Sequence, residues 1–525
     1  MELTKAPANA GMGEPEQTRS GGRLGLVIWA ALALVVCGLA ISNQSFWIDE
    51  ANTAVRAGQP TLVKWWQEMM ILKGSDLQMP GYMVFAWGWE KLVGLNEYAL
   101  RAGNAPWFLL GLIAMFRAVT ASRLQKCLAL VVLTNPLIWQ YLNEARPYAM
   151  QIGMSSVVFF SLYRLGCEQN APCRERYWII ALCVSSLILS TSSLLAMLWL
   201  GAYLVAAVLS TSMVRLRRLA QEYWLCWVLT FTLLFALGLY YLWTLHVGGR
   251  AAALEHATGF KNVPFILYEL LGFNGLGPGR LAIRTGGLHA FLPWLPWLAI
   301  YAAVLLPVLV LGWRQVVASM PLWTLVCWAG AFATVAAFIL AMGVAVGFRV
   351  LGRHFLPALP LILFMLGAGV NALLSRRGQV GQVVIVGFLG LTLVSSLNLR
   401  FSERHAKDDY RGAAMLGRQA LARGESVWWS ACLEGAEVYH LPVAEAPGTA
   451  TAALLVVDQN EKFLQNLPTP DLVLVSKPDL YDGSGALANY LMRAGFHRTK
   501  TLSAFTAWQA PRRRNPPTDP VGAGH

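Results

Sequence analysis

Apolar runs of about twenty residues, separated by short polar loops, recur through most of the chain. A helix of that length spans the hydrocarbon core of a bilayer. Only 13% of the residues are charged and 56% are hydrophobic, which is too little charge to cover a soluble protein of 525 residues. The chain is therefore predicted to be an α-helical polytopic membrane protein.

Eleven membrane spans are expected from these runs. The first, Leu24–Ser42, follows Arg23 and lacks a small-residue cleavage site after it, which favours a signal anchor over a cleaved signal sequence. Residues 1–23 are polar and aperiodic, and a disordered cytoplasmic tail is expected there. The other ten spans are expected at residues 100–116, 127–142, 147–163, 177–193, 194–213, 222–243, 291–311, 321–343, 355–374 and 379–398.

Basic residues cluster in four of the loops between spans, and such loops usually stay on the cytoplasmic side. The N-terminus is therefore predicted inside and the C-terminus outside. The net charge of +13 then reflects topology, and a nucleic-acid partner is not expected. The four clusters are Arg117, Arg123 and Lys126; Arg164, Arg174 and Arg176; Arg215, Arg217 and Arg218; and Arg376 with Arg377.

Two long segments are predicted on the outer side, residues 43–98 and 244–290. Within the first, residues 80–93 are apolar but short for a crossing and contain two charged residues. A helix lying on the membrane surface is therefore expected there. An amphipathic helix is expected at 61–71 and a short aromatic helix at 263–273.

The composition changes after Arg400, where polar and apolar residues begin to alternate. This pattern predicts a small external α/β domain at residues 400–510. The transmembrane domain is then residues 24–399, and a flexible Pro- and Arg-rich tail is expected at 511–525. Strands are expected at 426–429, 454–457 and 472–475, and a helix at 486–494.

Two adjacent carboxylates, Asp49 and Glu50, come immediately after the first span and the aromatic pair Phe46 and Trp47. At the outer lip of a membrane such groups are partly desolvated, which suits a general base or a cation-stabilising pair. The same residues also fit the first turn of a helix, because acidic side chains favour helix N-termini. Their spacing leaves both interpretations open.

Four arginines, Arg101, Arg146, Arg349 and Arg353, lie at the outer ends of predicted spans, against the usual bias of basic residues. An anionic partner is expected there, and a guanidinium group matches a phosphate with two hydrogen bonds. Contact with lipid headgroups, or pairing with Glu144, is the alternative.

Six short motifs follow one another in the order found in one family of membrane enzymes. Together they resemble the C-type membrane glycosyltransferases of the protein O-mannosyltransferase and aminoarabinose transferase group. These enzymes move a sugar, with inversion, from a polyprenyl-phosphate carrier to an acceptor on the outer face. The motifs are Trp47–Asn52, Met79–Tyr82, Gly94 with Glu97 and Leu100–Arg101, Asn143–Tyr148, Arg353–Pro360 and Lys407–Ala413.

The resemblance assigns catalytic roles to three acidic residues at matching positions. Asp49 falls on the family's catalytic aspartate, which implies a base that deprotonates or orients the acceptor, and Glu50 would be its partner. Glu144 falls near a second acidic position of the group. As an ionisable residue at the end of a span, Glu144 is also compatible with simple solvation.

The resemblance and the outward arginines together select candidate substrate-binding residues. Arg146 with Tyr148, and Arg353 with His354, are the preferred phosphate binders, since their charge would stabilise the leaving phosphate. Tyr82 and Tyr148 are expected either to stack on a sugar, to line the lipid groove or only to anchor their helices.

A bound metal has weak support. Glu255 and His256 resemble a Glu–His pair of aminoarabinose transferases, in which the histidine helps to hold a metal. Gln78 stands where those enzymes carry a further glutamate, and the other histidines show no ligand spacing. A divalent metal is therefore disfavoured but left open, and the sequence indicates no other cofactor.

Four residues after the last span, Asp408, Asp409, Tyr410 and Arg411, match an element at the start of the external domain in the same family. They are expected to join that domain to the membrane core. Direct contact with the acceptor is the alternative.

The predicted function is transfer of a sugar from a polyprenyl-phosphate donor at the outer face of a bacterial plasma membrane. The acceptor is left open among lipid A, a protein and a cell-envelope glycan. A polymerase or ligase of lipid-linked oligosaccharides, and a flippase or transporter of an anionic lipid, are the alternatives. A transporter is disfavoured because the charged residues lie at the external rim, not at mid-membrane.

Overall fold

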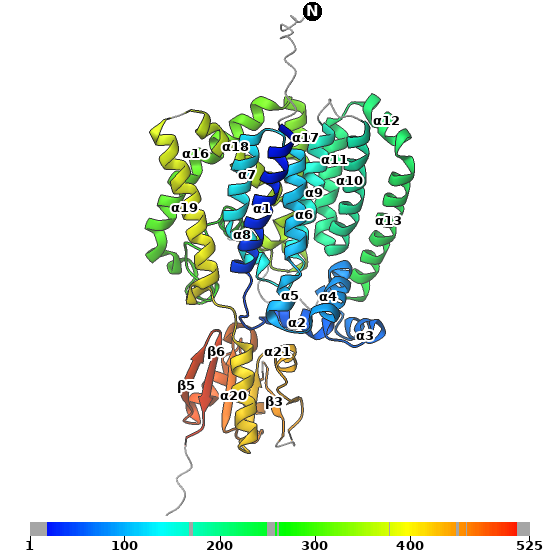
Figure 1. Cartoon of the computed structure of the whole chain (residues 1–525). Coiled ribbons are helices and arrows are strands. Elements are labelled where there is room, and N and C mark those ends of the chain that lie inside the picture. The colour runs from blue at the N-terminus through cyan, green and yellow to red at the C-terminus, as the bar shows by residue number, and fades with distance from the viewer. Residues whose placement is uncertain are drawn as a thin grey trace, which may run out of the picture.

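The chain folds into a bundle of long helices with a small sheet domain at one end, opposite the end at which α1 begins (Figure 1). The computed structural model describes residues 18–166, 172–248, 258–259, 262–376, 378–447, 451–457 and 459–511. The predicted fold class, an α-helical polytopic membrane protein with a small C-terminal α/β domain, is confirmed.

A helix lies at each of the eleven expected spans. By length and apolarity, six helical stretches of the described chain could cross a membrane, or seven if α11 (Leu194–Ser210) and α12 (Met213–Glu222), which meet at a sharp bend, form one span. The count of eleven spans stays a prediction, because helices such as the 13-residue α7 are short. The bundle helices are α1 (Thr18–Ala40), α6 (Ala105–Ala118), α7 (Ser122–Thr134), α8 (Pro136–Leu142), α9 (Tyr148–Gly166), α10 (Pro172–Ser192), α11 (Leu194–Ser210), α13 (Trp224–Val247), α16 (Leu295–Ser319), α17 (Leu322–Val346), α18 (Leu359–Ser375) and α19 (Gln379–Phe401).

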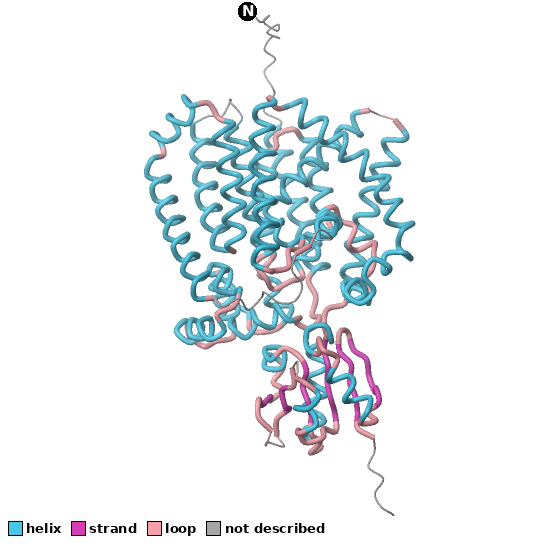
Figure 2. Tube along the Cα trace, turned by 180° about the vertical axis from the view of Figure 1, so that it is seen from behind, coloured by secondary structure: helices cyan, strands magenta, loops and turns pink. Residues whose placement is uncertain are grey.

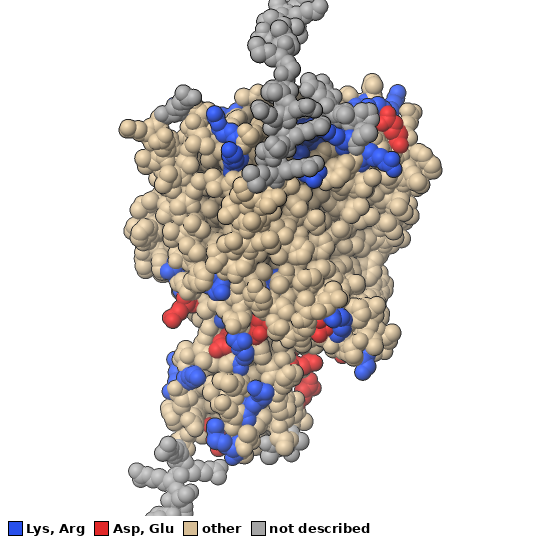
Figure 3. All heavy atoms as spheres, viewed as in Figure 1, with Lys and Arg blue, Asp and Glu red and all other residues tan. Residues whose placement is uncertain are grey.

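The charged side chains gather at the two ends of this bundle and on the sheet domain, with an uncharged band between them (Figure 3). The band is where lipid would surround the helices, because charged groups are costly to place in hydrocarbon. Many large apolar side chains of the bundle helices are exposed, for example Phe235 of α13 at 68% and Val383 of α19 at 71%. This surface fits an integral membrane protein.

The predicted span at 127–142 is divided into α7 and α8 at Asn135–Pro136. The Asn135 Oδ1 atom accepts hydrogen bonds from the backbone N–H groups of Leu137 (3.0 Å) and Ile138 (3.2 Å) and so caps α8. Pro136 occupies the first position of α8, where no backbone donor is needed. The short α8 then ends at Leu142 and leaves residues 143–147 at the end of the bundle that faces the sheet domain.

The first long segment after α1 folds into short helices below the bundle, next to the sheet domain (Figure 1). The helix expected at residues 80–93 is present as α4, and the one expected at 61–71 is present as α3. Thr61 caps α3 by accepting a hydrogen bond from the Lys64 N–H. The elements are α2 (Ile48–Ala57), α3 (Leu62–Leu72), η1 (Ser75–Gln78), α4 (Pro80–Val93) and α5 (Glu97–Ala102).

The second long segment supplies further short elements at the same end of the bundle, where loops and the sheet domain meet (Figure 2). The helix expected at 263–273 is present as α14 and ends three residues earlier. The elements of this segment are α14 (Asn262–Leu270), α15 (Arg280–Gly286) and η2 (Gly287–Trp294). Two further short elements, η3 (Gly352–Ala358) and η4 (Glu403–His405), follow α17 and α19.

The C-terminal domain contains one six-stranded sheet in the order β2-β3-β1-β4-β6-β5. Strands β2, β3, β1 and β4 are parallel, and β6 and β5 extend the sheet antiparallel. The hairpin β5–β6 was not predicted. The elements are α20 (Tyr410–Ala422), β1 (Val427–Ser430), α21 (Leu433–Val438), β2 (Val443–Ala444), β3 (Ala453–Leu455), α22 (Glu461–Gln465), β4 (Leu472–Ser476), α23 (Pro478–Tyr481), α24 (Ala486–Arg493), β5 (His497–Leu502) and β6 (Phe505–Gln509).

The two faces of this sheet are covered by different helices. Trp429 packs with Tyr410 of α20 on one face, whereas Trp428 stacks on Tyr490 of α24 on the other, with ring centroids 5.5 Å apart. Successive strand side chains point to opposite faces, so adjacent tryptophans serve two cores. The proposed domain boundary at 399–400 falls at the end of α19.

Candidate functional site

A cavity of about 1210 Å³ lies between the end of the bundle, the second long segment and the C-terminal domain. Its wall carries more basic than acidic side chains, which favours an anionic ligand. The carboxyl end of β4 contributes to it through Val475 and Lys477. The basic residues of the wall are Arg280, Arg284, Arg349, Arg353, Arg400, Arg404, Lys407 and Lys477; the acidic ones are Glu144, Glu269, Glu403 and Asp408.

Asp49 lies beside this cavity, in the first turn of α2. Its Oδ2 atom accepts a hydrogen bond of 2.8 Å from Arg353 Nη1, and both side chains are 25% exposed. Burial raises the pKa of Asp49, but attraction by Arg353 and Arg146 outweighs burial and leaves the pKa below its usual value. Asp49 is therefore a carboxylate at neutral pH, paired with a cation in the cavity wall.

Glu50 points away from Asp49 into the protein. Its carboxylate receives two hydrogen bonds from Arg101, of 2.8 and 2.7 Å, and one of 2.8 Å from the Ala145 N–H. Both Glu50 and Arg101 are completely buried. Burial raises the pKa of Glu50, but Arg101 and Lys407 overcompensate and hold it at about 2. The structure therefore does not bring the Glu50 carboxylate to Asp49.

Arg101 likewise does not reach the cavity. Besides Glu50, it donates to the backbone carbonyl groups of Ser42, Gln44 and Ser45. Every nitrogen of the guanidinium group thus has a protein acceptor, and no donor is left for a phosphate. The sequence placed Arg101 at the outer end of a span, but it could not show that the first loop folds over it.

Lys407 connects this cluster with the cavity. Its ammonium group donates to Glu50 Oε2 (2.8 Å) and to the Asn143 carbonyl, and it lines the cavity. Burial lowers the pKa of Lys407 to about 8, with Arg101 adding to the effect and Glu50 opposing it. The sequence marked Lys407 only as the first residue of a motif.

Glu144 lines the cavity and is 4% exposed. Among the described residues, the structure records no hydrogen bond to its carboxyl group, although Lys407, Arg280 and Arg353 act on it electrostatically. Burial is the largest effect and raises the pKa of Glu144. Its backbone is held by Asn104, whose Nδ2 atom donates to the Glu144 carbonyl at 2.7 Å.

Arg146 is held behind Asp49 and does not line the cavity. Its Nη1 atom donates to the Asp49 carbonyl and to Asp76 Oδ1, each at 3.0 Å. Asp76 also pairs with Arg56 at 3.0 Å, so one buried carboxylate joins two arginines. Sequence reasoning missed Asp76, since a lone aspartate in a loop carries no distinctive spacing.

The remaining predicted substrate-binding residues surround Arg353. The Arg353 guanidinium lies 5.9 Å from the centroid of the Tyr148 ring. His354 accepts the Leu351 N–H on Nδ1 (3.1 Å) and so caps the turn that carries Arg353, while Tyr82 is buried beside Phe85. Of the predicted cationic ligands, Arg349 and Arg353 line the cavity.

Three charged cavity residues from the second long segment, Glu269, Arg280 and Arg284, were not predicted. Glu269 accepts hydrogen bonds from the Gly352 N–H (2.9 Å) and from Arg280 (3.4 Å), and Glu269 is buried. A Cβ atom at position 352 would lie 2.6 Å from Glu269 Oε2, so a glycine is needed beside Arg353. Arg280 and Arg284 could have been found by the rule that outward basic residues need an anionic partner.

The described residues contain no group of three or more His, Cys, Asp or Glu side chains arranged to hold a metal ion. The weak metal candidates Glu255 and His256 lie outside the described residues. Gln78, at the position where the resemblance calls for a glutamate, ends the short helix η1.

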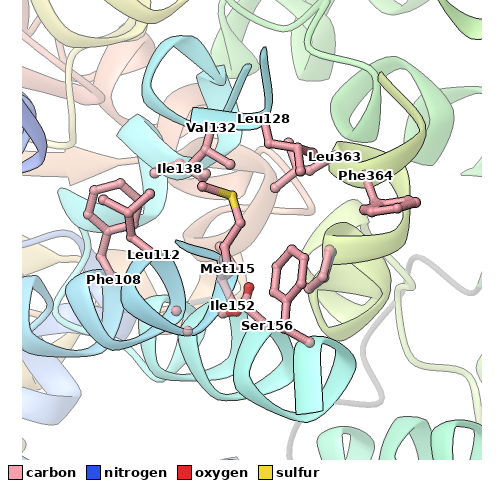
Figure 4. A pocket seen from close by; sticks show the side chains of 14 residues that line it. Phe108, Leu112, Met115, Leu128, Val132, Ile138, Ile152, Ser156, Leu363 and Phe364 are labelled. Atoms are coloured by element: carbon pink, nitrogen blue, oxygen red, sulfur yellow. Dashed lines mark hydrogen bonds between the residues drawn. The ribbon is translucent and has the colours of Figure 1, made fainter. Parts of the chain in front are cut away.

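A second, apolar cavity lies inside the bundle between α6, α7, α9 and α18 (Figure 4). Its volume is about 20 Å³, enough for roughly one water molecule. Phe108, Leu112, Met115 and Leu128 are among its lining residues. It is too small for a lipid chain and carries no cation, so the large basic cavity is the candidate site.

No protein-family model matches the chain, and no curated protein matches its sequence. Among solved structures, the chain is similar to apo ArnT from Cupriavidus metallidurans, with a TM-score of 0.54 and 15% identity over 93% of this chain and 98% of ArnT. A second structure of that ArnT, bound to undecaprenyl phosphate, aligns with a TM-score of 0.48 and 14% identity over 94% and 98%. The chain thus shares the fold of the apo ArnT structure.

Proposed function

We propose that this protein is an inverting glycosyltransferase that moves a sugar from a polyprenyl-phosphate carrier to an acceptor on the outer face of a bacterial plasma membrane. The observation that carries the proposal is the Asp49–Arg353 pair beside a large basic cavity. The fold shared with ArnT, an aminoarabinose transferase, supports it.

Asp49 is the proposed base. In the transfer, an acceptor hydroxyl attacks the anomeric carbon of the sugar and gives its proton to the Asp49 carboxylate. The bond between the anomeric carbon and the phosphate oxygen breaks, and the polyprenyl phosphate leaves with the electron pair. The lowered pKa of Asp49 keeps it ionised, and therefore able to accept a proton, throughout the neutral range.

Arg353 is the proposed phosphate ligand. Its Nη1 atom binds Asp49, and its Nε atom is buried without a hydrogen-bond partner among the described residues. A phosphate would compete with Asp49 for this guanidinium group, because both are anions that accept two hydrogen bonds. Donor binding would therefore release the carboxylate that the reaction needs.

Arg349, Lys407 and Lys477 add positive charge to the same wall. Lys477 lies 5.8 Å from the centroid of the Trp47 ring and pairs with Asp408. Charge placed around the leaving phosphate stabilises it as it develops. Glu50, Arg101, Arg146 and His354 are proposed to act by positioning the loops that carry Asp49 and Arg353.

The first test replaces the proposed base. Asp49→Asn is expected to lower transfer about 100- to 10,000-fold, the range of general-base catalysis. Binding of undecaprenyl phosphate should be no weaker than in the wild type, because Arg353 is then free of a competing carboxylate. The assay measures sugar transfer from radiolabelled undecaprenyl-phosphate sugars by purified protein, and binding separately. Undiminished sugar transfer by Asp49→Asn would contradict the proposal.

Glu403→Gln is the matched control, since it also removes a carboxylate from the cavity wall but not from the pair with Arg353. Transfer by this variant is expected to stay within a few-fold of the wild type. Movement of the labelled lipid across the membrane without product would instead favour a flippase, and extension of a lipid-linked glycan would favour a polymerase or ligase.

A further inference from the structure

Three side chains in the wall of the large cavity have hydrogen-bonding capacity that the described protein leaves unused. The Gln140 Nε2 and Asn274 Oδ1 atoms are buried without partners, and no hydrogen bond to the Glu144 carboxyl group is recorded. Asn274 is 7% exposed and Glu144 is 4% exposed. Burying a polar atom without a partner is unfavourable, so the two unpaired amide atoms, beside a carboxyl group without a recorded hydrogen bond, indicate that a ligand supplies the partners.

Gln140 and Asn274 form an amide pair. The Asn274 Nδ2 atom donates to Gln140 Oε1 at 2.8 Å. Whichever way the two amides are turned, the pair uses one donor group and one acceptor and leaves one N–H₂ group and one carbonyl oxygen. A pair that offers both a donor and an acceptor matches neighbouring hydroxyl groups, because each hydroxyl can give and accept a hydrogen bond.

The pair comes from two separate segments held firmly in place. Gln140 lies in the short helix α8, one turn before Glu144. Asn274 is followed by Gly275, whose N–H donates to Ser395 Oγ of α19 at 3.1 Å. A Cβ atom at position 275 would lie 1.9 Å from the Ser395 carbonyl oxygen, so a glycine allows this close approach. The amide positions are therefore fixed by packing.

The same wall connects these groups to the proposed reaction centre. Glu144 precedes Ala145, whose N–H donates to Glu50, and Glu50 adjoins Asp49 in α2. Arg353, the proposed phosphate ligand, acts on Glu144 electrostatically and shares the cavity wall with it. A sugar whose phosphate is at Arg353 would thus lie in the same cavity as Glu144.

Charge around these groups selects the kind of sugar. Lys407, Arg280 and Arg353 all act on Glu144 from the same cavity. An ammonium group on the sugar would be repelled by these three cations, and burial keeps Glu144 inclined toward its neutral form, which attracts a cation less. The amide pair carries no charge at all.

We propose that Gln140, Asn274 and Glu144 form the sugar subsite of the donor and recognise hydroxyl groups of a neutral sugar. This inference rests on the proposed function, because it assumes that the lipid phosphate binds at Arg353. Gln140 and Asn274 are specificity-determining residues in this arrangement. Binding of the phosphate by Arg353 does not depend on them.

The test compares carriers with and without a sugar on the purified full-length protein. Undecaprenyl phosphate is measured beside undecaprenyl phosphate bearing glucose, galactose, mannose or 4-amino-4-deoxyarabinose. The wild type is expected to bind at least one of the hexose-bearing carriers more tightly than the bare carrier, and not to prefer the amino sugar. Preference for the amino sugar, or no preference for any hexose, would overturn the inference.

The variants Asn274→Leu and Gln140→Met remove the amide groups with little change in size. Each is expected to weaken binding of the preferred hexose-bearing carrier about tenfold and to leave binding of bare undecaprenyl phosphate within twofold. Equal losses for both lipids, or no loss, would contradict the subsite. If Asn274→Leu fails to fold, Gln140→Met gives the same comparison from the other segment. Failure of the wild type to bind bare undecaprenyl phosphate would instead count against the proposed function.

Discussion

At the scale of single residues, Arg101 and Arg353 differ in how much of the guanidinium group remains available. Arg101 is fully buried and every nitrogen donates to Glu50 or to a backbone carbonyl. Arg353 has one recorded acceptor, Asp49, and its side chain is 25% exposed at the cavity. Arg101 therefore holds the first loop in place, whereas the Arg353 guanidinium group keeps donors that a ligand could use.

Replacement of these two arginines separates binding from folding. Arg353→Gln is expected to weaken binding of undecaprenyl phosphate about 10- to 100-fold, the effect of losing a charge-assisted hydrogen bond, with little change in melting temperature. Arg101→Gln is expected to cost about 3–5 kcal/mol of stability, because it leaves the Glu50 carboxylate buried without its main partner. Lipid-binding titrations and thermal unfolding in detergent measure the two effects. Equal melting temperatures for both variants would contradict this division.

The lowered pKa of Glu50 predicts how the stability of the fold depends on pH. Its pKa is about 2 in the folded protein, against 4.5 for an ordinary glutamate, so its ionised form stabilises the fold. This contribution is complete above about pH 4.5 and is lost as the pH falls toward 2. The melting temperature of wild type should therefore exceed that of Glu50→Gln most at pH 6, and the difference should shrink below pH 4.5. A difference that grows on acidification would show that Glu50 is not ionised in the fold.

At the scale of elements, the C-terminal domain holds the loop that leads into α2. The Tyr439 hydroxyl, at the end of α21, accepts the Phe46 N–H (2.8 Å) and donates to Glu97 Oε1 (2.7 Å). Arg411 of α20 also pairs with Glu97 and donates to the Asn43 carbonyl. Asp49 follows this loop directly, so contacts between domains position the proposed base.

Removal of the Tyr439 hydroxyl tests this positioning. Tyr439→Phe is expected to lower kcat about 3- to 10-fold and to leave KM for the donor and binding of undecaprenyl phosphate unchanged, because no substrate contact is lost. Tyr490→Phe is the matched control, since Tyr490 stacks on Trp428 on the face of the sheet covered by α24. A parallel loss in both variants, or a rise in KM alone, would argue against a positioning role.

At the scale of the whole molecule, the proposed orientation places the N-terminus in the cytoplasm and the sheet domain outside. The α1 start and the sheet domain lie at opposite ends of the bundle, and α12 with its basic residues lies at the α1 end (Figure 1). Basic loops favour the cytoplasmic side. The cavity then faces outward, where a flipped lipid-linked sugar would be available.

Cysteine labelling measures this orientation. In a Cys432→Ser background, Lys500→Cys on the sheet domain should react with a membrane-impermeant maleimide in intact spheroplasts. Arg217→Cys on α12 should react only after the membrane is permeabilised, because both positions are exposed in the fold but lie on opposite sides. The Cys432→Ser protein without an introduced cysteine, treated in the same way, is the control. The reverse labelling pattern would contradict the proposed topology and indicate that the cavity faces the cytoplasm.

The sequence predicted the elements of the fold well, because helices and strands follow from local periodicity. The expected helices at 61–71, 80–93 and 263–273 are present, and the parallel strands β1, β3 and β4 lie near their predicted positions, whereas β2 was not predicted. The β5–β6 hairpin was missed, since its exposed strand β5 lacks an apolar run. The number of spans stays a prediction, because broken and short helices blur the apolar pattern.

The sequence by itself determined that the chain belongs in a membrane and which residues form its helices. It also singled out Asp49 and the outward arginines as candidate site residues. These properties depend on neighbours along the chain or on hydropathy. Tertiary structure decided which carboxylate and which arginine lie at the cavity: Glu50 and Arg101 pair with each other in the interior, whereas Asp49 pairs with Arg353 of the cavity wall. The reason is that burial and hydrogen-bond partners come from segments up to 357 residues apart, which no local pattern records.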